Sequence, residues 1–130
     1  MARPKSTELT DRELVVMQAF WRDGKSMTAE DARQRLSESG EDLAYATVAN
    51  VVRALCERGF LQQLSDKRPF QFAAVKSFES VSNRLLGDFL KRLFGGSREA
   101  MLVQLLERKK LTASEREYLK QVLNDEENEA

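Results

Sequence analysis

Three side chains between positions 47 and 53 have the chemistry needed to contact the edges of DNA bases. Thr47, Asn50 and Arg53 follow one another at three-residue steps, so a helix would place them on neighbouring parts of its surface. An arginine can bind a guanine edge or a phosphate, an asparagine can pair with adenine, and a threonine methyl group can contact thymine. This combination indicates a helix that enters a DNA major groove.

Phosphate contacts are expected at two nearby places. Tyr45 and Ala46 lie at the predicted start of the helix, where backbone N–H groups and a phenol can bind a phosphate. Lys67 and Arg68 lie in a polar turn farther along the chain and supply two cations. Both places also have an ordinary structural interpretation, in which Tyr45 packs against the core and the two cations keep an exposed turn solvated.

The element that must position these residues begins near Leu43 and ends before Gly59. Its apolar residues recur at the three- and four-residue steps of a helix face, namely Val48, Val51, Val52 and Leu55. A basic residue followed by glycine, as in Arg58–Gly59, is a typical helix end. Because valine has low helix propensity, a strand is the competing interpretation, and tertiary packing must hold the helix.

A β-hairpin is predicted directly after this helix. The segments 60–64 and 70–73 have the length and apolar content of short strands, and residues 66–69 supply a tight polar turn between them. Pro69 has no N–H group, which suits the turn or the first position of a strand. A helix followed at once by a hairpin is typical of the recognition helix and wing of a winged helix.

Two helices are predicted before these elements, over residues 9–23 and 28–40. Thr10 and Thr28 each precede an acidic residue by three positions, which is the pattern of a capping box at a helix start. The resulting order is helix, helix, helix, hairpin. It predicts a mainly α protein with a winged helix-turn-helix DNA-binding domain over residues 9–75, whose third helix contacts the bases.

The composition excludes several classes of protein. The chain has 130 residues, one cysteine and no histidine, which removes an internal disulfide, the usual metal clusters and the commonest general base. We therefore expect no metal, no cofactor and no enzymatic activity. No apolar run approaches the roughly 20 residues of a membrane span, and the first residues lack the apolar segment of a secretory signal. A cytoplasmic protein without membrane insertion is expected.

The formal charges balance, with 21 basic and 21 acidic residues. DNA-binding domains are often basic overall, so the DNA surface of this chain has to be a local patch. Binding through such a patch weakens as the salt concentration rises. The neutral balance also leaves open a winged-helix module that binds another protein and not DNA.

Residues 76–125 are predicted to form a helical dimerisation region. A helix over 77–94 ends at a glycine pair, Ser97 opens a second helix and Thr112 opens a third. The first helix has an apolar stripe too wide for a lone surface helix, and the second is apolar on most sides. The region is nevertheless too short to build a core of its own. A second copy of the chain would cover them in a homodimer. The alternative is a monomer in which these helices pack on the winged helix.

The residues expected at this dimer interface are the large apolar ones of the three helices. They are Leu86, Phe89, Leu90, Leu93, Phe94, Met101, Leu102, Leu105, Leu106, Leu119 and Val122.

The acidic segment 124–130 is expected to be a frayed tail after the last helix.

Taken in order, these segments resemble the penicillinase repressor (BlaI/MecI/CopY) family. The resemblance covers roughly residues 9–125 and rests on LTDRELVVMQAFW, TAEDA, YATVANVVRALCERGF, KRLFGGS and LTASEREYLKQVL. It implies a bacterial transcriptional repressor that dimerises through its C-terminal helices. It also implies a palindromic double-stranded DNA operator with inverted TACA and TGTA half-sites.

The chain departs from the family pattern at some positions. Family members often carry a basic residue, a threonine and an arginine where this chain has Ala49, Asn50 and Ala54, so the resemblance does not fix the exact operator sequence. Repressors of the penicillinase type are cut by a membrane-bound sensor protease at an Asn–Phe bond, which aligns with Gln104–Leu105 here. The cysteine hook of copper-responsive members is missing. A small-molecule-responsive winged-helix repressor of another family is a further alternative.

Overall fold

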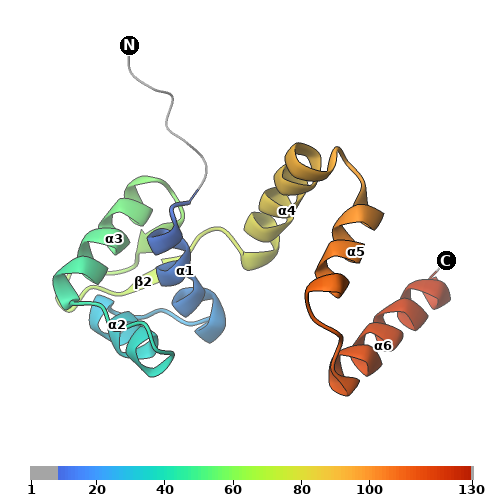
Figure 1. Cartoon of the computed structure of the whole chain (residues 1–130). Coiled ribbons are helices and arrows are strands. Elements are labelled where there is room, and N and C mark those ends of the chain that lie inside the picture. Colours follow the sequence, from blue (N-terminus) through green and yellow to red (C-terminus); the bar gives the residue numbers. More distant parts are fainter. Residues whose placement is uncertain (1–8, 130) are drawn as a thin grey trace, which may run out of the picture. The chain divides into compact units, whose positions relative to one another are not determined.

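The computed structural model describes residues 9–129, and the chain divides into two compact units at Leu85. The elements, in chain order (Figure 1), are α1 (Asp11–Asp23), α2 (Ala29–Glu38), α3 (Tyr45–Glu57), β1 (Leu61–Gln63), β2 (Phe72–Ala74), α4 (Phe78–Phe94), α5 (Arg98–Arg108) and α6 (Ala113–Glu129). The division falls within α4, whose first half belongs to the first unit. The order confirms the predicted mainly α fold with a winged helix in its first part.

Reciprocal capping defines where the first two helices begin. The Thr10 hydroxyl accepts a hydrogen bond from the Glu13 N–H (3.1 Å), and the Glu13 carboxylate accepts one from the Thr10 N–H (2.8 Å). Thr28 and Asp31 repeat the arrangement at α2, at 3.0 and 3.1 Å. Each box satisfies two N–H groups that the first turn leaves without a partner. Both capping boxes were predicted from the sequence and are confirmed.

Helix α3 is a helix and not the competing strand. Val48, Val52 and Leu55 are buried, while Ala44 at the N-cap provides no side-chain hydrogen bond. Packing therefore holds the helix, since burying a Val or Leu side chain contributes about 1.5–3 kcal/mol. Beyond its C-terminus, Gly59 has a φ of 82°, a left-handed conformation that glycine adopts without strain. This confirms the predicted glycine stop.

The hydrophobic core of the first unit draws on every one of its elements. Its largest fully buried side chains are Val16, Met17, Phe20, Val48, Val52, Leu55 and Leu61. Val81 in the first half of α4 joins the same core. The Trp21 indole N–H donates to the Lys76 carbonyl (2.9 Å), and the Trp21 ring meets Phe78 edge-on at 5.5 Å between centroids. The start of α4 is thereby fastened to α1.

The wing differs from its prediction in the position of its second strand. Leu61 pairs with Ala74 and Gln63 with Phe72 in an antiparallel register, so β2 begins two residues later than expected. The predicted tight turn is instead a loop over residues 64–71, closed by the Leu64 N–H to Gln71 carbonyl bond (2.7 Å). The physical reason is Pro69, which has no N–H to donate to a ladder.

A third extended segment joins the sheet of the wing. Met27, between α1 and α2, forms a bridge with Phe72 through two backbone hydrogen bonds of 2.9 and 2.8 Å. Met27 itself is buried. The wing is therefore anchored at its base to the connection that precedes α2.

The second unit consists of the rest of α4 and of α5 and α6. Ser97 caps α5 by accepting from the Ala100 N–H (3.1 Å), and Thr112 forms a capping box at α6. The expected frayed tail from 124 on is wrong as far as the structure describes it, because α6 continues to Glu129. The segment has no Gly or Pro, and glutamate is a good helix former, so nothing ends the helix earlier.

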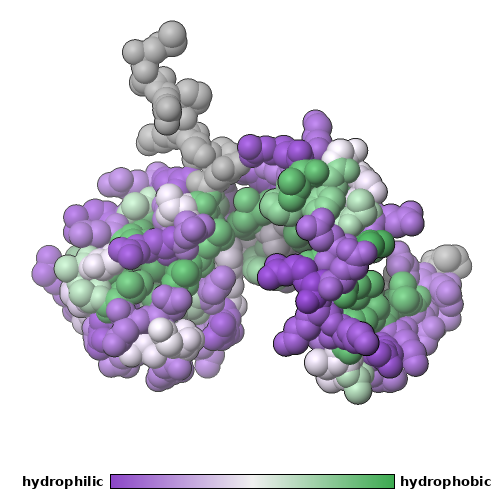
Figure 2. Space-filling view, viewed as in Figure 1, coloured by the Kyte–Doolittle hydropathy of each residue, from purple (hydrophilic) through white to green (hydrophobic). Residues whose placement is uncertain are grey.

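The described residues of this second unit have no interior of their own. From Leu86 to the last described side chain, none is classed as buried, although the segment is rich in Leu and Val. Figure 2 shows patches of hydrophobic surface on these C-terminal helices. Over the described part of the chain, no helix is long and apolar enough to cross a membrane.

Candidate nucleic-acid interface

The outward face of α3 carries most of the residues predicted to contact DNA. Ala46, Asn50 and Arg53 are exposed, and Thr47 is half-buried. Within residues 9–129, Arg53 makes no ion pair and no hydrogen bond. Its guanidinium is therefore available to a guanine edge or a phosphate.

The N-terminus of α3 is built differently from those of α1 and α2. The first turns of α1 and α2 carry acidic residues and a capping threonine, whereas α3 has no acidic residue in its first turn and no side-chain cap at Ala44. Its first N–H groups and the positive end of its dipole are thus open to an anion. Tyr45 is 55% exposed, so it does not take the alternative place in the core.

The loop of the wing presents the second group of cations. Lys67 and Arg68 are both exposed. The Arg68 guanidinium lies 5.5 Å from the centre of the Phe70 ring, a cation–π contact that orients the side chain without neutralising it. Among the described residues, neither cation forms an ion pair with Asp66 or any other carboxylate.

A groove of about 690 Å³ lies between α3, the wing and the start of α2. It brings together Tyr45, Arg53 and Arg68, three of the predicted DNA-binding residues. The other four, Ala46, Thr47, Asn50 and Lys67, do not line it. The groove also exposes Ala49 and Cys56 of α3, which were not predicted as site residues. Their place on the face shared with Tyr45 and Arg53, at four- and three-residue steps, was the signal that could have identified them.

A buried ion pair sets the position of α3 against α1. Arg58, the C-cap of α3, donates to the carboxylate of Glu13, which is only 7% exposed. Burial opposes the charged form of Glu13, but the Thr10 N–H and the Arg58 guanidinium together hold the pKa of Glu13 below its usual value. Glu13 thus joins the cap of α1 to the end of α3 through one charged side chain.

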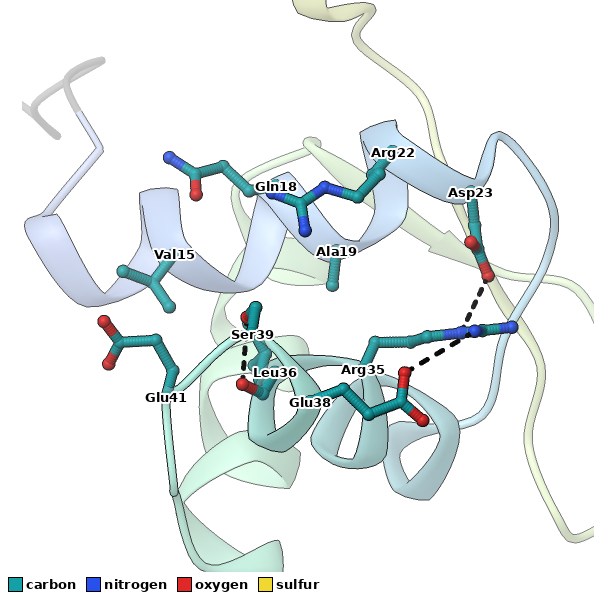
Figure 3. A pocket seen from close by; sticks show the side chains of 10 residues that line it. All are labelled: Val15, Gln18, Ala19, Arg22, Asp23, Arg35, Leu36, Glu38, Ser39 and Glu41. Atoms are coloured by element: carbon teal, nitrogen blue, oxygen red, sulfur yellow. Dashed lines mark hydrogen bonds and ion pairs between the residues drawn. The ribbon is translucent and has the colours of Figure 1, made fainter.

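A smaller cavity of about 240 Å³ lies between α1 and α2 and has a different character. In Figure 3, Arg35 extends between Asp23 (3.2 Å) and Glu38 (3.8 Å), so its charge is already balanced by two carboxylates. None of the predicted DNA-binding residues lines this cavity. It is therefore not part of the candidate interface.

The described residues contain no group of three or more His, Cys, Asp or Glu side chains that could hold a metal ion. Cys56 is the one cysteine of the chain. Burial and, to a lesser extent, the charge of Glu57 raise the pKa of its thiol, which disfavours the reactive thiolate.

The residues predicted for dimerisation lie on the surface of the described chain. Leu90, Phe94 and Met101 are half-buried. The others are exposed, namely Leu86, Phe89, Leu93, Leu102, Leu105, Leu106, Leu119 and Val122. Gln104 and Leu105, the residues aligned with the protease site, lie within α5 and are also exposed.

Sequence comparison finds similar proteins over most of the chain. The family model of the penicillinase repressor matches residues 9–125. The methicillin resistance regulatory protein MecI of Staphylococcus aureus strain N315 is 21% identical over 120 residues, which are 92% of this chain and 96% of that protein. MecI of Mammaliicoccus sciuri gives the same identity and coverage.

The solved structures found by comparison are more distant in sequence. One, described as a structure of prokaryotic transcription factors, has a TM-score of 0.49 at 17% identity and covers 68% of this chain and 84% of that one. The family match spans nearly all of the described residues, including α3, the wing and the C-terminal helices. The chain therefore belongs to the penicillinase repressor family of DNA-binding transcriptional repressors.

Proposed function

We propose that the protein represses transcription by binding a palindromic operator as a homodimer, with one copy of α3 in the major groove of each half-site. The observation that carries this proposal is Arg53, which lies on the exposed face of α3 and has no ion pair among the described residues. The N-terminus of the same helix has no side-chain cap and no acidic residue in its first turn. The remaining contacts follow from chemistry. Asn50 pairs with adenine, the Thr47 methyl group contacts thymine, and Arg53 binds guanine or phosphate.

Phosphate contacts hold the protein in register on the duplex. The N–H groups at Tyr45 and Ala46 bind one phosphate, aided by the phenol of Tyr45. Lys67 and Arg68 of the wing bind a second stretch of backbone. This role places the protein in the cytoplasm, where the operator DNA is.

A second copy of the chain is the proposed cover for the apolar side chains of the second unit. Many exposed leucines on α4, α5 and α6 would be unusual in a monomer, because monomeric proteins rarely expose large apolar patches without a binding partner. A twofold dimer matches a palindromic operator, because the same symmetry relates its two reading helices.

Cleavage by a membrane-bound sensor protease is the proposed route of release. The candidate bond, Gln104–Leu105, lies in the middle of α5, so cutting it would divide the dimer surface. Two half-site contacts would then no longer be linked, and the gain from joint binding would be lost.

Fluorescence anisotropy tests the proposal directly. A labelled duplex with inverted TACA and TGTA half-sites and a scrambled duplex of the same composition are titrated at several salt concentrations. Preferential binding of the palindrome, with two chains per duplex, is the expected result. Equal binding to both would point to a different operator. Absence of any salt-dependent DNA binding would favour a winged-helix module that binds a protein, consistent with the zero net charge.

A further inference from the structure

The groove between α3 and the wing has the size and lining of a small-molecule site. Its volume of about 690 Å³ lies within the range that such sites occupy. Apolar side chains from three elements form much of its wall, including Ala49 and Val52 of α3 and Phe72 of β2. Phe70 and Pro69 of the wing loop extend this apolar wall.

The charges around the groove are unbalanced in favour of an anion. Arg53 and Arg68 line it and, within the described part of the chain, have no carboxylate partner. The one acidic side chain among the lining residues is Glu30, and Arg33 already binds it through two hydrogen bonds of 2.9 and 2.6 Å. A ligand therefore meets two available guanidinium groups beside an apolar wall.

We propose that this groove binds a small aromatic carboxylate, which blocks DNA binding by occupying the groove. The ring would pack on the apolar wall, and the carboxylate would pair with Arg53 and Arg68, as guanidinium groups favour. The same two arginines are proposed DNA contacts, so ligand and operator compete for them. Only this competition rests on the proposed function; binding of the ligand does not.

Cys56 supplies a direct readout, because the one thiol of the chain lines the groove. The full-length protein is treated with a thiol-reactive disulfide reagent in mildly alkaline buffer, with increasing concentrations of 2-naphthoate. The expected result is saturable protection of Cys56. A neutral analogue, 2-naphthalenemethanol, should protect about tenfold less well, since it lacks the charge-assisted hydrogen bonds.

Two variants locate the site. Ala49→Phe fills the groove, and Arg68→Gln removes one of its cations; each should weaken protection about tenfold or more. The matched controls are Ala113→Phe at the start of α6 and Arg12→Gln on α1, which should protect like the natural protein. Neither control residue lines the groove.

Amide NMR shifts on 2-naphthoate addition complete the test. Shifts confined to residues around Ala49, Arg53 and Phe72 support the proposal. Shifts confined to α4–α6, protection unaffected by both variants, or no binding of 2-naphthoate would overturn it. In a second experiment 2-naphthoate should displace the labelled operator. The two proposals can fail separately. If the protein does not bind the operator, the displacement experiment cannot be done, but protection of Cys56 still tests the ligand site.

Discussion

At the scale of single residues, the proposed DNA interface relies on arginines that have no carboxylate partner among the described residues. Arg53 has no ion pair among the described residues, whereas Arg58, the C-cap of α3, donates to Glu13 of α1. Helix periodicity predicted Arg53 for the outward face of α3. The ion pair of Arg58 was not predicted, because it depends on how α1 packs against the end of α3.

Replacing Arg53 with alanine should weaken operator binding while leaving the fold and the dimer intact. The expected loss is about 1–3 kcal/mol of binding free energy, the worth of one good base contact. Anisotropy titrations measure this loss, and sedimentation checks the oligomeric state. Arg12→Ala, an exposed arginine on α1, is the control. Equal affinities of Arg53→Ala and the unmodified protein would remove Arg53 from the interface.

Glu13 should make the stability of the first unit depend on acid pH. Its pKa is lowered in the folded state, so the folded state binds the proton less readily than the unfolded chain. The stabilisation is therefore fully present above the ordinary glutamate pKa of about 4.3 and is lost as pH falls through the folded pKa. Urea denaturation followed by Trp21 fluorescence at a series of pH values measures this.

Glu13→Gln should lower the unfolding free energy by about 2 kcal/mol at neutral pH, because it replaces the carboxylate that accepts from Arg58 and from the Thr10 N–H with a neutral amide. Part of the acid dependence should disappear with it. Glu115→Gln is the matched control, since Glu115 occupies the same position in the exposed Thr112 capping box of the second unit. The Thr112 cap lowers the pKa of Glu115 without an arginine, so this variant shows how much acid dependence a capping carboxylate alone contributes. If Glu13→Gln keeps the full acid dependence of the unmodified protein, Glu13 has the same pKa in the folded and unfolded chain, and the prediction is wrong.

At the scale of elements, local signals were sufficient for the helices. Capping boxes, periodic valines and glycine stops involve residues within four positions of one another, so the sequence carries them directly. The start of β2, the Met27–Phe72 bridge and the groove depend on segments that are far apart in the chain. Nothing in the sequence near Met27 indicates that its backbone pairs with the wing, which is why these features were not predicted.

Two glycines should respond in opposite ways to alanine. Gly59 has a left-handed φ of 82°, so Gly59→Ala should destabilise the first unit by about 1 kcal/mol through backbone strain. Gly87 lies within α4 without a left-handed φ, and an added Cβ meets nothing within 4 Å. Gly87→Ala should therefore raise helix stability by about 0.5–1 kcal/mol. Thermal unfolding followed by circular dichroism compares them; changes of the same sign would contradict the assignment.

At the scale of the whole molecule, the two units differ in what completes them. The first unit has a core from all of its elements, while the second has no buried residue among those described. Length and apolar content already indicated that the second region could not be self-sufficient. The partner that covers the apolar surface of the second unit cannot be identified from a local sequence pattern, since exposed leucines can pack against any apolar surface.

A charge in the middle of α5 should test the proposed dimer. Leu105→Asp places a carboxylate on the apolar surface and should give monomers or aggregates in sedimentation velocity, with a large loss of operator affinity. Ser114→Asp adds the same charge at an exposed polar position at the start of α6 and should remain dimeric. A normal dimer for Leu105→Asp would exclude α5 from the interface.

If the proposed dimer forms, a C-terminal unit with no buried residue among those described makes the proposed repression depend on the abundance of the chain. When two chains must dimerise to cover their exposed leucines, the concentration of the dimer that binds the operator rises with the square of the chain concentration at low expression. Gene silencing then has a threshold: a modest fall in copy number, through dilution at cell division or through partial proteolysis, lowers operator occupancy more than proportionally. The same sequence feature that leaves α5 and α6 uncovered would thus sharpen the switch between a silent and an expressed gene.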